Sequence, residues 1–259
     1  MAQLRAEKRV VVSPDADALS EKVATRLLNR VGRRAATGKQ THLLISGGTA
    51  VTAVLRAAGS ADARRDVDWS RVHLWWADER FVPADSPERN VSMARDALLS
   101  HIDLPEENVH AFAASDGGID LDAAARAYAE DLERHAARAN PWPDFSECFL
   151  GVGPDGHIAS LFPDRTEIAD LDNAVLPVRH SPVPPSDRLT VTRRVINSAR
   201  RVWMILPGAD KASALGLALA GASYHSVPAA GAKGRRHTIF FVDEAAAGDV
   251  PEELIDPDF

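Results

Sequence analysis

The sequence has a single cysteine among its 259 residues, Cys148. One cysteine cannot form a disulfide within the chain, and this favours a reducing compartment. Because Cys148 lies in an apolar run with Phe149 and Leu150, we expect a buried, unreactive thiol. The fold must therefore rest on a hydrophobic core, and a chain of this length can build one without disulfides or metal.

Long apolar runs and an excess of positive charge are also missing. No stretch reaches about 18 consecutive apolar residues, so no segment is predicted to span a membrane. Residues 1–8 lack the apolar core of a secretory signal, and we expect a cytoplasmic protein. The 37 acidic residues outnumber the 30 basic ones, which gives a net charge of −7. Nucleic-acid-binding proteins usually have the opposite balance, so we expect no nucleic-acid partner.

Motifs typical of two classes of enzyme, serine hydrolases and zinc enzymes, are absent as well. The chain has no Gly-x-Ser-x-Gly sequence, the sharp turn that exposes a catalytic serine in α/β-hydrolases. Its nine histidines show no metal-ligand spacing such as His-Glu-x-x-His. We therefore expect no metal site of that kind and no covalent nucleophile.

Short β-branched runs alternate with longer segments of helical period. An apolar residue at every fourth position from Leu19 to Val31 predicts an amphipathic helix that reaches about residue 36. Ser13 is predicted to cap this helix, with Pro14 at its first position. Further helices are predicted from about residue 50 and over residues 121–138, and strands over residues 10–12, 42–46, 72–77, 147–150, 189–192, 202–206 and 238–242. This alternation predicts one α/β domain over residues 1–259 with a mainly parallel sheet.

Ligands of open α/β sheets bind at the carboxyl ends of the strands. Five loops predicted at such positions contain residues that could bind a ligand or take part in catalysis. The first loop is Ser46-Gly47-Gly48-Thr49, between a strand and a helix. Its glycines allow a ligand to approach the backbone, and the helix start offers free N–H groups to a phosphate. A tight turn with Thr49 as the helix cap is the alternative, and the residues of this loop leave both open.

The second loop contains Asp78, Glu79 and Arg80, directly after the strand predicted over residues 72–77. Two carboxylates followed by a guanidinium can orient a water molecule and stabilise a developing negative charge. A solvated turn with an ion pair is equally consistent with these residues. By itself the second loop favours neither interpretation.

The third loop is rich in glycine and ends on a histidine. It contains Gly151, Gly153 and Gly156, followed by His157, with Asp155 two residues before the histidine. Histidine titrates near neutral pH and can take a proton from water. A lone histidine is more often structural than catalytic, but the neighbouring glycines and Asp155 favour a catalytic base here.

The last two loops carry positive charge. Arg188 follows the proline-rich segment 181–185, and a guanidinium held by this segment could bind a phosphate in a bidentate manner. Lys211 is predicted in the first turn of a helix, where its charge opposes the helix dipole unless an anion binds nearby. For each of the two residues the alternative is an ordinary surface side chain.

Together, the five loops resemble the 6-phosphogluconolactonase family, in the same order from Ser46 to Lys211. The most specific segments are Asp78-Glu79-Arg80-x-Val82-Pro83 and Gly151-x-Gly153-x-Asp155-Gly156-His157-x-Ala159-Ser160-Leu161-Phe162-Pro163, supported by His180-Ser181-Pro182 through Arg188-Leu189-Thr190. Asn90 matches a family asparagine that follows the acidic loop. The family's first loop usually reads Ser-Gly-Gly-Ser-Thr-Pro, whereas Ala50 and Val51 follow Thr49 here. We therefore expect Ala50 to lie outside the site.

The resemblance implies a Rossmann-like, three-layer αβα core with a smaller added lobe, the fold of glucosamine-6-phosphate deaminase and ribose-5-phosphate isomerase. It implies a monomeric enzyme without metal or cofactor that hydrolyses a sugar-phosphate lactone, 6-phosphogluconolactone, in the oxidative pentose phosphate pathway. The implied catalytic residues are His157, Asp155, Arg80, Asp78 and Glu79. The implied phosphate ligands are Ser46, Gly47, Gly48, Thr49, Arg188 and Lys211, and the implied sugar contacts are Asn90, Gly153 and Gly156.

Two other functions remain compatible with these loops. A sugar-phosphate isomerase or deaminase of the same fold could use the same histidine, but deaminases carry a Phe-Asn-Glu-Pro type of sequence where this chain has Ala159 to Pro163. A non-catalytic sugar-phosphate sensor would keep the phosphate loops and lose the base or the acidic loop. This chain retains both His157 and the acidic loop.

Overall fold

The computed structural model describes residues 7–138, 140–248 and 250–256. Within these residues, a seven-stranded sheet has the order β1-β10-β9-β6-β2-β3-β5, and each neighbouring pair is parallel. A smaller antiparallel sheet has the order β4-β8-β7. The strands are β1 Glu7–Ser13, β2 Thr41–Ile45, β3 Val72–Trp76, β4 Asp78–Arg80, β5 Val109–His110, β6 Phe145–Gly151, β7 Val175–Val178, β8 Arg188–Val191, β9 Arg201–Leu206 and β10 His237–Asp243.

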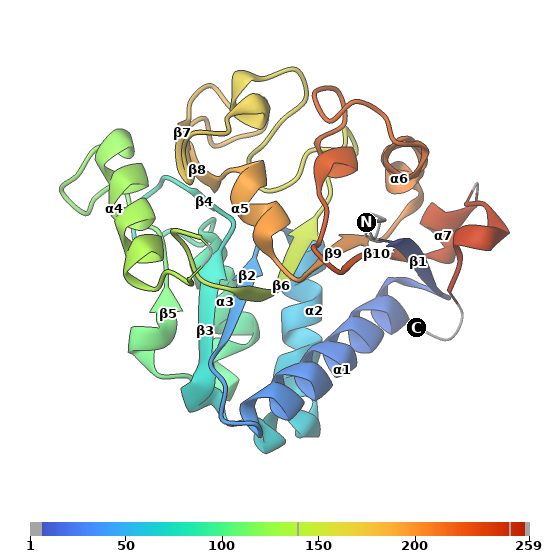
Figure 1. Ribbon diagram of the computed structural model, residues 1–259, viewed down its shortest axis with the longest axis horizontal. Helices are drawn as coiled ribbons and strands as arrows, with labels where there is room; N and C mark the ends of the chain where they lie inside the picture. Colours follow the sequence, from blue (N-terminus) through green and yellow to red (C-terminus); the bar gives the residue numbers. More distant parts are fainter. Residues whose placement is uncertain (1–6, 139, 249, 257–259) are drawn as a thin grey trace.

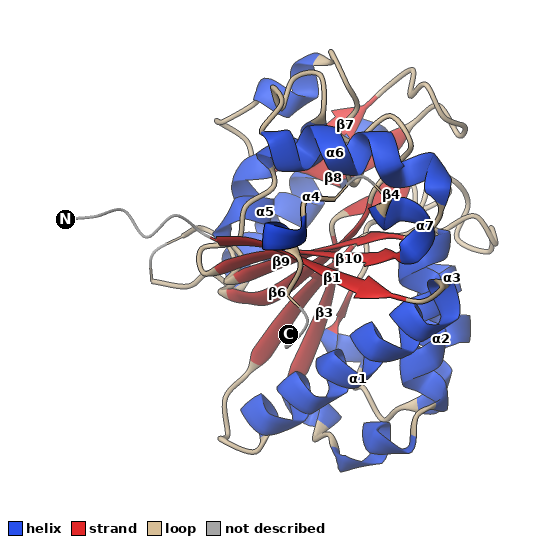
Figure 2. Ribbon diagram, turned by 90° about the vertical axis from the view of Figure 1, so that its right-hand side faces the viewer, coloured by secondary structure: helices blue, strands red, loops and turns tan. Residues whose placement is uncertain are grey.

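Helices cover both faces of the large sheet (Figure 1). Figure 2 shows α1, α2 and α3 on one face, and α4, α5, α6 and the small sheet on the other. The helices are α1 Ala16–Ala35, α2 Thr49–Ser60, α3 Asn90–Ala97, α4 Leu121–Arg134, α5 Arg193–Ser198, α6 Ala212–Ala220 and α7 Glu244–Ala247. The prediction of a three-layer αβα fold with a mainly parallel sheet and a smaller added lobe is confirmed.

The central strands are buried on both faces, which explains why their sequences are apolar throughout. In β9, the residues from Val202 to Leu206 are each at most 1% exposed. In β6, Cys148 is fully buried, and this burial raises the pKa of its thiol. The expectation of a buried thiol is confirmed, and a thiol held protonated in this way is a poor nucleophile.

Several predicted boundaries are wrong. Ser13 ends β1, where it pairs with Asp243 of β10, and the cap of α1 is Asp15 instead. The Asp15 carboxylate accepts a hydrogen bond of 2.8 Å from the backbone N–H of Ala18. Strand pairing thus holds the backbone of Ser13 in an extended conformation. The carboxylate of Asp15, two residues later, accepts a hydrogen bond from a free N–H group of the first turn of α1.

Helix α4 is shorter than predicted, and the acidic loop is a strand. After Arg134 the chain turns back, and Ala137 N–H donates to the Trp142 carbonyl at 2.9 Å, which overrides the helix propensity of the alanines there. The three charged residues predicted as a loop form β4, because their backbone pairs with β8. Their side chains do not alternate between apolar and polar, so the sequence pattern could not indicate a strand here.

None of the described helices is both long and apolar enough to cross a membrane. Residues 1–6, which make up most of the segment tested for a secretory signal, lie outside the described residues.

Candidate active site

A cleft of about 400 Å³ opens at the carboxyl ends of β2, β6 and β9, beside β4. It lies where the parallel strands of an α/β fold ordinarily present their ligand-binding loops. Eleven of the fourteen site residues implied by the resemblance line it: Ser46, Gly47, Gly48, Thr49, Asp78, Arg80, Asn90, Gly153, His157, Arg188 and Lys211. Three others, Glu79, Asp155 and Gly156, are not among its lining residues, and each holds a lining residue in place.

His157 is paired with a carboxylate. Its Nδ1 lies 2.6 Å from Asp155 Oδ1, and the same oxygen accepts the His157 backbone N–H at 3.1 Å. Partial burial opposes ionisation of Asp155, but the hydrogen bonds from His157 outweigh it and lower the pKa of Asp155. An ionised carboxylate accepts the proton on Nδ1, so Nε2 of the neutral imidazole keeps its lone pair.

The turn that seats the imidazole requires glycine. A Cβ on Gly153 would lie 2.1 Å from Nδ1 of His157 and 2.6 Å from Oδ1 of Asp155. Gly156 has φ +83°, and its N–H closes the turn on the Gly153 carbonyl at 2.9 Å. Both glycines were assigned to substrate binding by resemblance. Gly153 does line the cleft, and both glycines are needed by the turn that positions His157.

The amino end of α2 also opens into the cleft. Its N-cap is Gly48, with φ +90°, and no described side chain caps it. The first hydrogen bond of the helix runs from Thr52 N–H to the Gly48 carbonyl at 3.0 Å, so the N–H groups before it have no acceptor inside the helix. Thr49 is therefore not the cap, and its neighbour Ala50 lines the cleft. The expectation that Ala50 lies outside the site is wrong, because the first turn of α2 itself forms the wall.

Ser46 joins two strands at the cleft floor. Its Oγ accepts the backbone N–H of Gly151 at 2.9 Å and donates to the Gly47 carbonyl at 3.2 Å. The residue is only 3% exposed. Its hydroxyl thus fixes the ends of β2 and β6 next to each other.

Asp78 and Glu79, which the sequence could not tell apart, have different places. Asp78 lines the cleft, and its Oδ2 accepts a hydrogen bond from Ser160 Oγ at 2.8 Å. Glu79 is fully buried, and its carboxylate accepts the backbone N–H groups of Asn90 and Val91 at 2.7 and 3.0 Å. Glu79 therefore caps the start of α3, behind the cleft wall.

Asn90 comes into the cleft from the first position of α3. Its Nδ2 donates to the Asp78 carbonyl at 2.8 Å, while its buried Oδ1 has no hydrogen-bond partner in the described part of the chain. A Cβ on Gly47 would lie 1.8 Å from this oxygen. Glycine at position 47 thus allows Asn90 to reach the cleft.

Arg188 is buried in the wall and already holds much of its own loop. Its Nε donates to the Pro185 carbonyl, and its Nη2 donates to the carbonyls of Val183 and Pro184. Among the contacts of the described residues, this leaves Nη1, which lies 3.4 Å from Ser160 Oγ. The expected bidentate fork is therefore used on the proline-rich loop, and Arg188 contributes charge and a single nitrogen to the cleft.

Two further cations line the cleft. Arg80 donates from Nη1 to the Glu88 carbonyl at 2.6 Å. Lys211 ends a single 3-10 turn and is the N-cap residue of α6, one position before the helix in which it was predicted. Its Nζ lies 3.0 Å from Oδ2 of Asp210, a lining residue that the sequence analysis missed although it is adjacent in the loop.

These features define a class of protein: an αβα fold whose carboxyl-end cleft combines an open helix start, several cations and an aspartate-paired histidine. Such a cleft suits a small anionic ligand next to an acid–base group. The chain belongs to the family of glucosamine-6-phosphate isomerases and 6-phosphogluconolactonases, whose model matches residues 14–241. The family predicted from the loop motifs is thus confirmed.

Curated relatives and solved structures agree with this assignment. A protein named 6-phosphogluconolactonase from Streptomyces coelicolor is 42% identical over 257 residues, which cover 96% of this chain and 97% of that protein. One from Mycobacterium tuberculosis is 44% identical over 244 residues, covering 93% and 98%. The structure of 6-phosphogluconolactonase from Thermotoga maritima matches with a TM-score of 0.79 at 25% identity, over 92% of this chain and 100% of that one. A monomeric glucosamine-6-phosphate deaminase shares the fold, with a TM-score of 0.75 at 19% identity, over 93% and 99%.

Proposed function

We propose that this chain hydrolyses 6-phospho-D-glucono-lactone to 6-phospho-D-gluconate, in the oxidative pentose phosphate pathway. The observation that carries the proposal is that the His157–Asp155 pair and the open amino end of α2 meet at one cleft. The names of the curated relatives support the choice of substrate. We further propose that the protein acts as a cytoplasmic monomer with a single domain, and light scattering of the purified chain would test the monomer.

The phosphate of the substrate would bind at the start of α2. The free N–H groups of the first helical turn and the hydroxyl of Thr49 are donors for its oxygens. Lys211 and Arg188 would supply positive charge from the opposite loops, although Asp210 neutralises part of the charge of Lys211. The lactone ring would then extend from α2 toward His157, and Asn90 Oδ1 is free to accept a sugar hydroxyl.

The reaction needs only general acid–base chemistry. His157 Nε2 takes a proton from a water molecule, whose oxygen attacks the lactone carbonyl carbon. The carbonyl oxygen becomes an oxyanion, which the guanidinium of Arg80 would stabilise. When the bond between this carbon and the ring oxygen breaks, His157 returns its proton to the ring oxygen, and the new carboxylic acid ionises.

Asp155, Asp78 and Glu79 would each hold another group of the site in position. Asp155 keeps the proton of His157 on Nδ1, so that Nε2 can serve as the base. Asp78 and Ser160 hold each other at the cleft wall, next to Nη1 of Arg188. Glu79 positions α3 and with it Asn90.

The test is a direct assay of the purified chain on freshly prepared lactone. Acid release is followed in weak buffer against a matched sample without enzyme, because the lactone also opens spontaneously. The proposal expects saturable acceleration over that sample. Equal rates with and without enzyme, or release of ammonia from glucosamine 6-phosphate instead, would contradict it, the second in favour of a deaminase.

A further inference from the structure

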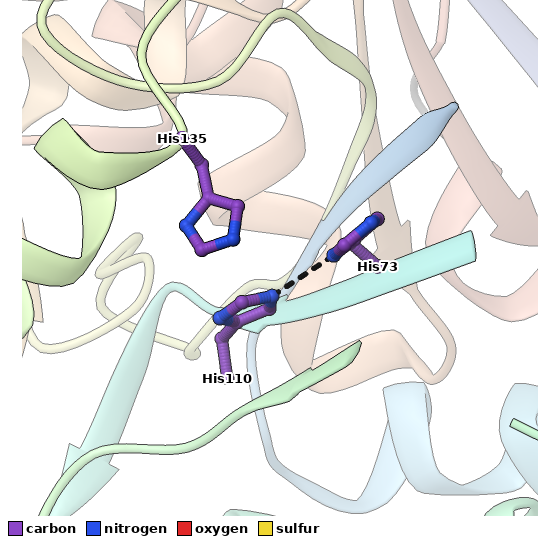
Figure 3. Close-up of side chains that lie close together, drawn as sticks. All are labelled: His73, His110 and His135. Atoms are coloured by element: carbon purple, nitrogen blue, oxygen red, sulfur yellow. Dashed lines mark hydrogen bonds between the residues drawn. The ribbon is translucent and has the colours of Figure 1, made fainter. Parts of the chain in front are cut away.

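A second group of titratable side chains lies away from the cleft, on the sheet face covered by α4. It contains His42 of β2, His73 of β3, His110 of β5, and His135, which follows α4 directly. His73, His110 and His135 each place one ring nitrogen within 4.8 Å of the other two (Figure 3). His42 and His73 are the second residues of their strands, so the histidine group begins at the amino ends of β2 and β3.

Two of the three imidazoles are oriented by an acceptor behind them. Nδ1 of His110 lies 2.9 Å from Oδ2 of Asp131, and Nδ1 of His135 lies 3.1 Å from the Asp131 backbone carbonyl. Both acceptors lack a hydrogen, so each Nδ1 carries the proton and each Nε2 is left with its lone pair. In Figure 3 the second ring nitrogen of His135 is turned toward the other two rings. A carboxylate or a carbonyl behind the ring is the usual outer partner of a metal-binding histidine.

The third imidazole, that of His73, faces the Nε2 atom of His110. Nδ1 of His73 lies 3.0 Å from Nε2 of His110, and Figure 3 marks this contact. Because Nε2 of His110 has a lone pair, the hydrogen between the two rings belongs to His73. A metal ion can replace this hydrogen once the proton of His73 moves to its other ring nitrogen. Nitrogens that bind zinc tetrahedrally at about 2.0–2.1 Å are about 3.4 Å apart, a spacing between the 3.0 Å contact and the 4.8 Å limit of the group.

The rings are held in place by packing. His110 is 6% exposed and stacks on Trp75 with ring centroids 3.6 Å apart and planes 1° apart. His73 stacks on His42 at 4.6 Å, and His42 uses its own Nδ1 to accept the Trp75 indole N–H at 3.1 Å. The side chain of His135 is 31% exposed, which leaves a path from solvent. The site is thus largely preformed and still open to an ion.

We propose that His73, His110 and His135 bind one divalent transition-metal ion of the zinc, nickel and copper class, with Asp131 as a positioning residue. Three neutral imidazoles suit these ions and leave a further position for water. The proposal departs from the sequence-based expectation of no metal site. That expectation considered histidines close together in the chain, whereas His73 and His110 are 37 positions apart. It does not depend on the proposed function, because the cleft uses none of these residues.

The test is calorimetric titration of the full, untagged and chelator-treated chain with zinc chloride, paired with the visible spectrum of the cobalt(II) form. We expect one ion per chain, with the intense cobalt absorption of a four-coordinate site. His135→Ala should weaken zinc binding by at least about tenfold, and Asp131→Asn by about 10- to 100-fold. His225→Ala, which removes an exposed histidine elsewhere, is the matched control and should leave binding unchanged.

His157→Ala separates this site from the cleft, since the His157–Asp155 pair is another potential zinc ligand. The proposal is overturned if zinc binding is not saturable, if it survives His135→Ala at full affinity, or if it is lost in His157→Ala instead. The near-ultraviolet circular dichroism of each metal-free variant checks its fold. If His135→Ala lost the native spectrum, His73→Gln would take its place, with the same expected loss of affinity.

Discussion

Strands β2 and β3 have candidate functional side chains at both of their ends, and the surroundings of the two ends differ. At the carboxyl ends, Ser46 and Asp78 enter a cleft made of consecutive loop residues, glycines and a helix start. At the amino ends, His42 and His73 belong to a group of rings packed on the sheet. The cleft is assembled from short continuous motifs, whereas the histidine group is assembled only by folding.

Both regions contain an aspartate–histidine pair, and the surroundings decide what each pair can do. Asp155 holds Nδ1 of His157 at 2.6 Å, and Asp131 holds Nδ1 of His110 at 2.9 Å. The first imidazole opens on a cleft with cations and an open helix start, which suits a base acting on an anionic substrate. The second faces two more imidazoles, which suits a metal ligand.

Among the variants that retain His157, the largest effect is expected from Gly153→Ala. The added methyl group would lie 2.1 Å from Nδ1 of His157, so the imidazole must leave its position. Turnover should fall by about 10²- to 10⁴-fold, the full contribution of general acid–base catalysis. Gly216→Ala is the matched control, because a Cβ there meets nothing within 4 Å. A Gly153→Ala variant with normal kcat would show that the position of this imidazole is not important.

The next largest effect is expected from Asp155→Asn. The amide no longer favours the proton on Nδ1 of His157, and we expect turnover to fall by about 10²-fold while zinc binding is unchanged. Asp131→Asn makes the same change in the other pair and should leave turnover unchanged. Measuring both activities in both variants tests whether the two pairs are independent. If Asp131→Asn slowed turnover as much as Asp155→Asn, the division of roles would be wrong.

The histidine group should make stability depend on pH in the metal-free protein. Burial, followed by the charge of neighbouring histidines, lowers the pKa of His42 to about 3 and that of His73 to about 4. Unfolded histidine has a pKa of about 6.5, so between about pH 6.5 and 4 the unfolded chain binds protons that the folded chain does not. The free energy of unfolding should therefore fall as the pH is lowered through this range, by about 3 kcal/mol from His42 and by a smaller amount from the more exposed His73.

Urea unfolding at several pH values, in the presence of a chelator, measures this dependence. His42→Asn keeps an acceptor for the Trp75 indole and cannot be protonated. The variant should have a weaker pH dependence than the parent chain. An identical dependence in the two proteins would mean that His42 does not contribute to it.

The smallest effect is expected from Lys211→Ala. The change removes one positive charge from the cleft, but Asp210 already compensates part of it. We expect KM to rise about tenfold with little change in kcat, as for the loss of one charge-assisted hydrogen bond. Lys233→Ala, an exposed lysine that is not among the cleft residues, is the control. A fall in kcat instead of a rise in KM would place Lys211 closer to the reacting atoms.

The comparison of the two regions also explains how much the sequence could predict. The central strands and the five segments at the cleft were found because short apolar runs, glycine-rich motifs and charged clusters are local features of the sequence. The separate roles of Asp78 and Glu79 were not predictable, because they depend on which carboxylate faces the start of α3. The hydrogen bonds of Arg188 to its own loop, and the meeting of His73 with His135, depend on contacts that only the folded chain makes.

The central claim is that the imidazole of residue 157 activates water in the carboxyl-end cleft. Its most direct test is the turnover of fresh 6-phosphogluconolactone by His157→Ala, with the parent chain and His225→Ala measured beside it. The account predicts that kcat falls by about 10²- to 10⁴-fold in His157→Ala, with KM nearly unchanged. Turnover close to that of the parent chain would contradict the account.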